Sequence, residues 1–184
     1  GGGIGFAAAQ RCAEEGCRAV VISDIHERRL NEAVEKLQQT HPETAITGRL
    51  ANVASEEDVQ NLVDAAEEFT GGVDVLINNA GVSEFKLLED SNELSIAKLI
   101  DLNLTVPIQL SHLLLPYLQS KGEAAVINIG SALGAIGYPA YSVYGASKFG
   151  LRGFSEALRR ELGDSAVRVM HLAPRATNTA SNSA

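Results

Sequence analysis

Short apolar runs alternate along the chain with longer stretches in which apolar residues recur every three or four positions. The short runs predict strands at residues 19–22, 45–51, 73–77, 124–129 and 167–172. The longer stretches predict helices over residues 4–15, 26–39, 55–70, 92–119 and 141–162. Ser55 opens the third helix with a capping-box pattern, Gly71 and Gly72 close it, and Pro107 is expected to bend the fourth.

Regular alternation of strands and helices predicts parallel β-α-β units. We therefore expect an α/β fold with a doubly wound, Rossmann-like parallel sheet and helices on both faces. The chain shows no internal repeat, low-complexity tract or linker, so residues 1–184 are expected to form a single domain. The chain starts on glycines without a preceding strand and ends on a polar tail. We expect the first strand and C-terminal elements to be missing from it.

Composition narrows the class of protein. The 15 basic and 23 acidic residues among 184 give a net charge of −8, which disfavours nucleic acid and anionic membranes as partners. No apolar run reaches the ~18 residues of a membrane span. Cys12 and Cys17 are too few for a disulfide framework and suit a cytoplasmic location. His112 and His171 have no metal-ligand partners at a usable spacing, so no metal site is expected.

A glycine-rich turn, with Gly3, Ile4 and Gly5, stands where the first expected helix begins. Glycines there let backbone N–H groups approach phosphate oxygens, and the helix dipole favours the negative charge. Asp24 follows Gly5 by 19 residues, close to the spacing at which dinucleotide-binding folds place an acid on the adenosine ribose. The alternatives are a flexible chain end for the glycines and a helix N-cap for Asp24.

The charge of Asp24 bears on the choice of cofactor. A carboxylate at that position repels a 2′-phosphate, so NAD is favoured and NADP is less expected. His26, Arg28 and Arg29 follow closely and weaken this preference, although we interpret them mainly as a solvated helix face.

A second group of residues has catalytic character. Tyr144 and Lys148 are four apart in an expected helix, so they share a face. Ser131 stands just after the apolar strand at residues 124–129, at the carboxyl end where open α/β sheets place ligands. Two asparagines, an alanine and a glycine, residues 78–81, occupy the matching end of the preceding strand.

Together these motifs resemble the short-chain dehydrogenase/reductase family, and the resemblance covers nearly the whole chain. Gly3, Ile4 and Gly5 match the end of its phosphate pattern, and residues 78–81 match its Asn-Asn-Ala-Gly motif. Residues 144–148 match its Tyr-x-x-x-Lys, Ser131 precedes the tyrosine by thirteen residues, and Asn103 is the asparagine of the long helix. By this resemblance the strand order is 3-2-1-4-5-6.

The resemblance implies an oxidoreductase in which Asn103, Ser131, Tyr144 and Lys148 are catalytic. A phenol is a poor base near neutrality, because its unperturbed pKa is near 10, and a neighbouring ammonium favours the phenolate. Tyr144 would exchange a proton with the substrate oxygen, Ser131 would position that oxygen, and Lys148 would also bind the nicotinamide ribose. Asn103 would hold a water on a proton path. The cofactor would also be contacted by Asn79, Ala80 and Gly81.

Several of these residues have simpler interpretations. Asn103 in a helix can bond a neighbouring backbone group, and Ser131 can cap a helix or turn. Tyr138 and Tyr141 lack a lysine four residues on, so we expect them to line the substrate cleft or the helix entry.

Two segments depart from the family pattern. Asn52 and Val53 stand where the family commonly has Asp-Val against adenine, and the amide oxygen of Asn52 can still accept a hydrogen bond. After the last strand the cofactor-binding residues implied are Pro174, Thr177 and Thr179. Arg175 replaces a family glycine and faces either an anionic ligand or solvent.

The expected function is hydride transfer between NAD and a small-molecule secondary alcohol or ketone. Two alternatives stay open: an NADPH-dependent 3-oxoacyl-thioester reductase, and a nucleotide-binding regulator without turnover. The resemblance also implies a homodimer or homotetramer built on the helices at residues 92–119 and 141–162. Leu102, Leu110, Leu113, Leu114 and Phe149 are candidates for that interface or for the core.

Overall fold

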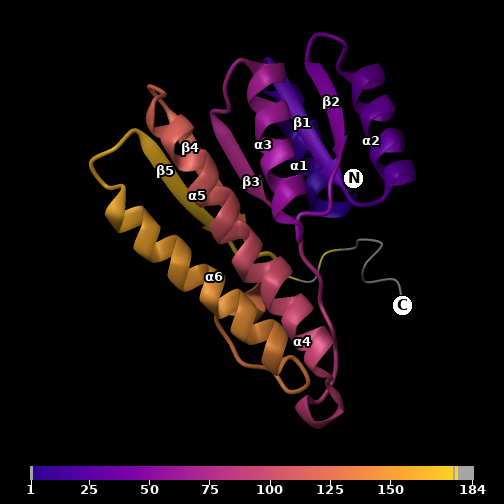
Figure 1. The fold of residues 1–184 in the computed structure, drawn as a ribbon, viewed down its shortest axis with the longest axis vertical. Helices are drawn as coiled ribbons and strands as arrows, with labels where there is room; N and C mark the ends of the chain where they lie inside the picture. Colours follow the sequence, from indigo (N-terminus) through magenta and orange to yellow (C-terminus); the bar gives the residue numbers. More distant parts are fainter. Residues whose placement is uncertain (1, 176, 178–184) are drawn as a thin grey trace. The chain divides into compact units, whose positions relative to one another are not determined.

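The computed structural model describes residues 2–175 and 177, which fall into two compact units (Figure 1). The first unit comprises the described residues up to Gly72 together with Thr177, and the second begins at Val73. We describe each unit by itself.

The first unit is built on two parallel strands, β1 (Ala19–Asp24) and β2 (Ala45–Leu50). Three helices accompany them: α1 (Gly3–Glu14), α2 (Glu27–Thr40) and α3 (Glu56–Thr70). α1 and α3 pack on β1, and α2 packs mainly on β2. A parallel pair needs a crossover, and α2 supplies it.

Apolar side chains from both layers form the core of this unit. Ala9, Leu37 and Ile46 are buried together, and Phe6 and Val20 pack against them. The helix ends follow the sequence signals. The Ser55 hydroxyl accepts from the backbone N–H of Asp58, and Gly71 ends α3 in the left-handed conformation with φ 67°. The expected capping box is therefore confirmed at its N-cap bond.

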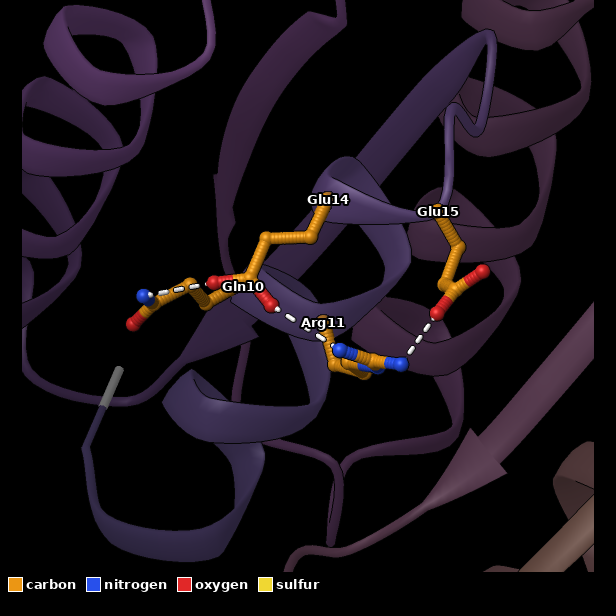
Figure 2. Close-up of polar contacts among 4 residues, drawn as sticks. All are labelled: Gln10, Arg11, Glu14 and Glu15. Atoms are coloured by element: carbon orange, nitrogen blue, oxygen red, sulfur yellow. Dashed lines mark hydrogen bonds and ion pairs between the residues drawn. The ribbon is translucent and has the colours of Figure 1, made fainter.

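The exposed face of α1 carries polar pairs one helical turn apart (Figure 2). Gln10 donates to Glu14 at 3.0 Å, and Arg11 contacts both Glu14 and Glu15. Such exposed pairs contribute little to stability, about 0.3–0.5 kcal/mol each. They mark this face of α1 as solvated, while Ala9 and Ala13 lie on its buried face.

The second unit contains a three-stranded parallel sheet in the order β3-β4-β5 (Val75–Asn78, Ala124–Ile129 and Val167–Leu172). α5 (Val106–Gln119) packs on β3 and β4, and α6 (Ser142–Glu161) packs on β5. Because the strands are parallel, the segments that follow Asn78, Ile129 and Leu172 leave the sheet at the same edge. That edge positions the candidate site.

The stretch at residues 92–119 differs from the single bent helix that was expected. It divides into α4 (Glu93–Ile100), a π-helical segment (Asp101–Thr105) and α5. Pro107 lies in the first turn of α5, and it has no N–H to donate to the carbonyl of Asn103 four residues earlier. The α-helical hydrogen-bond pattern is therefore interrupted just before Pro107, where the chain forms the wider π turn.

The parallel strands and crossover helices confirm the α/β, Rossmann-like fold. The neighbours within each sheet agree with the order 3-2-1-4-5-6, with β1 and β2 as strands 2 and 3 and β3 to β5 as strands 4 to 6. Leu110 and Leu114 are core residues, whereas Phe149 is exposed. Among the described helices, none combines the length and the apolarity needed to cross a membrane.

Candidate active site

α6 carries the two central residues of the candidate site. Tyr144 and Lys148 lie one turn apart on this helix, and the Lys148 ammonium nitrogen is 5.9 Å from the centre of the Tyr144 ring. The same nitrogen donates to the backbone carbonyl of Ile129, the last residue of β4, at 3.0 Å. This bond holds the lysine against the carboxyl edge of the sheet and beside the tyrosine.

Lys148 is buried, with 6% of its surface exposed. Burial disfavours the charged form and lowers the pKa of Lys148 from 10.5 to about 8. An ammonium so placed retains most of its charge at neutral pH and has two N–H groups beyond the one given to Ile129. It is suited to stabilise a neighbouring anion.

The π-helical segment places Asn103 in the interior, where it is fully buried. Its side-chain oxygen accepts from the backbone N–H of Val82 at 2.9 Å, and its amide donates to the Val82 carbonyl at 2.8 Å. The amide also donates to the Ser147 hydroxyl at 3.1 Å. The side chain of Asn103 thus bonds a backbone, which was its simpler interpretation, and connects the segment after β3 to α6.

Gly81 lies against both Asn103 and Lys148. A Cβ atom at this position would be 2.7 Å from the side-chain oxygen of Asn103 and 3.6 Å from the Lys148 nitrogen. Only glycine fits so close an approach. The structure therefore brings together Gly81, Asn103, Tyr144 and Lys148, as the sequence motifs imply.

Ser131 caps the short 3-10 turn Ala132–Gly134, because its hydroxyl oxygen accepts from the backbone N–H of Leu133 at 3.1 Å. The hydroxyl hydrogen is not used in that bond and can be donated to a substrate oxygen. This turn packs on α6, where a Cβ at Gly134 would be 2.9 Å from the carbonyl oxygen of Lys148. The carbonyl of Pro174 accepts from Ala132 at 3.1 Å and fixes the other side of the turn.

Buried polar residues lie behind the site; Asn78 belongs to the motif at residues 78–81, whereas Asn128 and Ser155 were not singled out from the sequence. Asn78 donates to the Asn128 side chain at 2.8 Å, and Asn128 donates to the Ser155 hydroxyl at 2.9 Å. Ser147 donates to the Tyr144 carbonyl at 2.7 Å. Asparagine in a strand that is otherwise apolar was the available signal, because a buried amide must find partners. These bonds connect β3, β4 and α6 and orient the helix that carries Tyr144.

The first unit holds the expected phosphate and adenosine residues. Gly3 has φ 56°, a left-handed conformation that favours glycine, and it opens α1 with Ile4 and Gly5 in the first turn. The first turn of α1 contains no acidic residue. Its backbone N–H groups and the helix dipole are therefore suited to an anion.

Asp24 ends β1, and its side chain is 11% exposed. It accepts from the backbone N–H of His26 at 2.8 Å and from the Arg29 guanidinium at 3.2 Å. Arg29 is therefore more than part of a solvated helix face. The N-cap of α2 is His26, so Asp24 is not the helix N-cap of its simpler interpretation. Asn52 is exposed, and its side-chain oxygen accepts from Ala54 at 3.1 Å.

The remaining expected residues are placed as follows. Val53 is half-buried beside Asn52, and Asn79 and Ala80 follow β3. Thr177 is exposed, and Thr179 lies outside the described residues. Across the described part of the chain, no three His, Cys, Asp or Glu residues gather in a way that could hold a metal ion.

Comparison with known proteins decides the family. The family model described as short chain dehydrogenase matches residues 1–184. The chain belongs to the short-chain dehydrogenase family. This assignment agrees with the arrangement of Tyr144, Lys148 and Asn103 described above.

Curated relatives include dehydrogenases and reductases. A 3α-hydroxysteroid dehydrogenase of Mediterraneibacter gnavus is 30% identical over 177 residues, which are 96% of this chain and 70% of the relative. The human dehydrogenase/reductase SDR family member 4 is 33% identical over 94% of this chain and 61% of its own length. The 3-oxoacyl-(acyl-carrier-protein) reductase FabG of Vibrio cholerae is 33% identical over 127 residues, 69% of this chain and 52% of that protein. The chain thus spans about two thirds of the first two relatives.

Solved structures share the fold. A short chain dehydrogenase from Mycobacterium smegmatis has a TM-score of 0.89 and 30% identity, over 95% of this chain and 72% of that one. A metagenomic short-chain oxidoreductase in complex with NADP has a TM-score of 0.87 and 27% identity, over 95% and 78% of the two chains.

The donors and acceptors of the short-chain dehydrogenase chain suit a nicotinamide cofactor. The N-terminus of α1 offers backbone N–H groups for phosphate, and Asp24 offers a carboxylate for ribose hydroxyls. In the second unit, the ammonium of Lys148 and the phenol of Tyr144 offer hydrogen bonds for a ribose. The residues present therefore fit the group in each unit taken separately.

Proposed function

We propose that the protein transfers a hydride between a nicotinamide cofactor and a secondary alcohol or ketone. The observation that carries the proposal is the position of the buried Lys148 ammonium, 5.9 Å from the Tyr144 ring and anchored on Ile129. A lysine that loses hydration without gaining a carboxylate partner is costly to bury. Its place beside a phenol is explained by a role in proton transfer.

The residues of the second unit divide the chemistry among them. Tyr144 accepts the hydroxyl proton of the alcohol in oxidation and donates a proton to the ketone oxygen in reduction. Ser131 donates its hydroxyl hydrogen to the same oxygen and orients it. Lys148 stabilises the phenolate and binds ribose hydroxyls. When bound, the nicotinamide supplies the hydride acceptor in oxidation and the hydride donor in reduction.

Asn103 is proposed to hold a water that relays protons to Lys148. Its side chain is committed to Val82 and Ser147, so its backbone carbonyl is the group proposed to bind this water. Pro107, four residues on, has no N–H for that carbonyl, which supports the assignment.

The cofactor is proposed to be NAD in preference to NADP. Gly3, Ile4 and Gly5 are assigned to its phosphates, Asp24 to the adenosine ribose, and Asn52 with Val53 to adenine. Asn79, Ala80, Gly81, Pro174, Thr177 and Thr179 are assigned to the nicotinamide riboside. The carboxylate of Asp24 supports NAD by charge repulsion, although Arg29 at 3.2 Å offsets part of that charge and one similar structure is a complex with NADP.

A second candidate is reduction of 3-oxoacyl thioesters with NADPH, which the relative from Vibrio cholerae favours. A nucleotide-binding regulator without turnover is disfavoured, because it has no need of Asn103, Ser131, Tyr144 and Lys148 together. We also propose a homodimer or homotetramer, for which the exposed Phe149 on α6 is an interface candidate.

The test is Tyr144→Phe in the natural full-length protein, with nucleotide reduction followed by absorbance on a panel of secondary alcohols. Loss of the proton-transfer group is expected to lower kcat by about 10²–10⁴-fold, a far larger effect than the loss of its hydrogen bond to ribose has on cofactor affinity. Tyr117→Phe, a half-exposed tyrosine on α5, is the matched control. Full turnover by Tyr144→Phe refutes the assignment, and turnover of 3-oxoacyl thioesters alone supports the second candidate.

A further inference from the structure

A row of aromatic rings leads away from Tyr144 within the second unit. The ring centre of Tyr141 is 5.7 Å from that of Tyr144, and Phe85 is 5.2 Å beyond Tyr141. Tyr138 lies 6.3 Å from Tyr141 on the same loop. These separations fall in the range of favourable aromatic pairs, and the planes are tilted by 53–59°. We call Phe85, Tyr138 and Tyr141 the aromatic row.

The backbone holds the aromatic row in place. Lys86 donates its N–H to the carbonyl of Ala140 at 2.8 Å, which joins the segment carrying Phe85 to the loop carrying Tyr138 and Tyr141. Ala140 has φ 64°, a left-handed conformation that is uncommon for a residue with a Cβ atom. Backbone strain of this kind persists where the surrounding structure imposes it, and it is concentrated at functional sites. Here the strained residue directly precedes Tyr141.

The outer end of the row borders an open hollow of about 710 Å³. Apolar side chains of Phe85, Leu87, Tyr138 and Pro139 line it. Phe85 is 69% exposed and Tyr138 is 59% exposed, although rings of this size gain most from burial. This open apolar surface can exclude water from one face of a flat apolar group that packs on the exposed rings.

The charges at the hollow favour an uncharged occupant. The ammonium of Lys86 lies 3.9 Å from the carboxylate of Glu84, so part of its charge is offset. Asp90, which also lines the hollow, adds a negative charge. An anionic carrier thioester would meet repulsion here, whereas an uncharged ring would replace exposed aromatic surface with a contact.

We propose that the aromatic row is a substrate subsite that selects uncharged ketones and secondary alcohols with a flat, aromatic ring substituent. This inference rests on the proposed function, because Tyr144 at the inner end of the row is the proton-transfer residue. The reacting oxygen lies at Tyr144, and the ring substituent extends along Tyr141 toward Phe85. The flat faces of Tyr141 and Phe85 then contact the substituent.

The test compares two ketones with the same carbon skeleton in the natural full-length protein. The probes are 2-acetonaphthone, which is flat, and its fully saturated counterpart, which is puckered. The measured quantity is the ratio of kcat/KM for the two ketones. We expect a preference of about tenfold for the flat ketone, since each aromatic contact accounts for roughly three- to tenfold.

Variants then test whether the aromatic row causes the preference for the flat ketone. Tyr141→Leu and Phe85→Leu keep apolar volume and remove the ring, and each is expected to lower kcat/KM roughly three- to tenfold for the flat ketone only. Tyr117→Leu removes an exposed ring from α5 and is expected to leave the ratio unchanged. Phe85 is so exposed that its replacement leaves the core intact, which keeps the test valid if Tyr141→Leu fails to fold.

Equal kcat/KM for the two ketones, or equal losses on both in the variants, overturns the subsite while leaving the proposed function standing. If no ketone or alcohol turns over, the proposed function fails, and the subsite is decided by direct binding of 2-acetonaphthone followed through its fluorescence. Binding that Phe85→Leu weakens supports the subsite, and binding that it leaves unchanged overturns it. If Phe85→Leu abolishes self-association and leaves the ratio of kcat/KM for the two ketones unchanged, the aromatic row is a contact between copies of the chain. The substrate subsite is then overturned.

Discussion

The side-chain amide of Asn103 donates to the hydroxyl of Ser147, which donates in turn to the backbone carbonyl of Tyr144. Two residues that are 44 positions apart in the sequence thus connect the π-helical segment to the helix of the candidate site. Both side chains are fully buried. A buried hydrogen-bonding chain of this kind is sensitive to the removal of any member.

Ser147→Ala is expected to leave an amide hydrogen of Asn103 without its partner. The cost of an unsatisfied buried donor predicts a loss of about 1–3 kcal/mol in the free energy of unfolding, measured by urea denaturation. Ser142→Ala, an exposed serine at the start of the same helix, is expected to change stability by less than about 0.5 kcal/mol. Equal effects of the two variants would contradict a structural role for the Asn103–Ser147 bond.

Gly81→Ala is expected to displace Asn103 or Lys148, because its Cβ would be 2.7 Å from the side-chain oxygen of Asn103. Overpacking of this kind costs about 1–3 kcal/mol of stability. We also expect kcat/KM to fall at least about tenfold, since misplacement of catalytic groups is costly. Gly122→Ala is the matched control, because a Cβ there meets nothing within 4 Å. Wild-type stability and activity in Gly81→Ala would show that the packing is looser than the distance indicates.

The buried ammonium of Lys148 gives stability a pH dependence of definite sign. The pKa of Lys148 is 10.5 when the side chain is exposed to water, as in the unfolded chain, and about 8 in the folded protein. Between these values the unfolded chain binds more protons, so stability rises with pH, and below pH 8 the penalty is fully present. The shift corresponds to about 3 kcal/mol.

The free energy of unfolding is therefore expected to rise by about 3 kcal/mol more in the wild type than in Lys148→Met between pH 8 and 10.5. Chemical denaturation at several pH values measures the difference, and the comparison cancels the titration of other groups. Parallel pH profiles for the two proteins would mean that Lys148 is solvated in the folded state.

Charge changes at the end of β1 are expected to shift the cofactor preference in opposite directions. Asp24→Asn removes the carboxylate and is expected to raise affinity for NADPH relative to NADH by about tenfold, which corresponds to 1.4 kcal/mol. Arg29→Ala removes its cationic partner at 3.2 Å and is expected to favour NADH further. Arg28→Ala, which pairs with Glu32 instead, is the control. An unchanged ratio in Asp24→Asn would remove Asp24 from the cofactor site.

The sequence predicted those parts of the structure that depend on local pattern. The apolar runs predicted all five strands to within a few residues, and the four-residue spacing predicted that Tyr144 and Lys148 share a face. The family resemblance implied that Asn103 belongs with them, which the shared contacts of Gly81 support. The assignment of these residues to catalysis stays a prediction.

Other features depend on contacts between distant segments and have no local pattern. The π-helical segment is fixed by bonds from Asn103 to Val82 and Ser147, 21 and 44 residues away. Glycine is needed at position 134 because a Cβ atom there would be 2.9 Å from the backbone carbonyl oxygen of Lys148. In each case the local structure depends on a packing partner that is distant in the sequence, and the neighbouring residues in the sequence do not identify that partner.

The wide turn of the π-helical segment has a consequence for how this region tolerates changes in length. A π turn contains about one residue more than an α turn, so removing a single residue between Asp101 and Thr105 would restore a continuous α-helix. Each α-helical residue advances by about 100° around the axis, so an extra residue in a regular α-helix would rotate one flank by that angle against the other. The wide turn takes up the extra residue, so the two flanks would keep their rotational phase after the deletion. The deletion would instead remove the turn that holds the amide of Asn103 against Val82 and Ser147. One surplus residue is thus accommodated without changing the phase between the front and back halves of this long helical stretch.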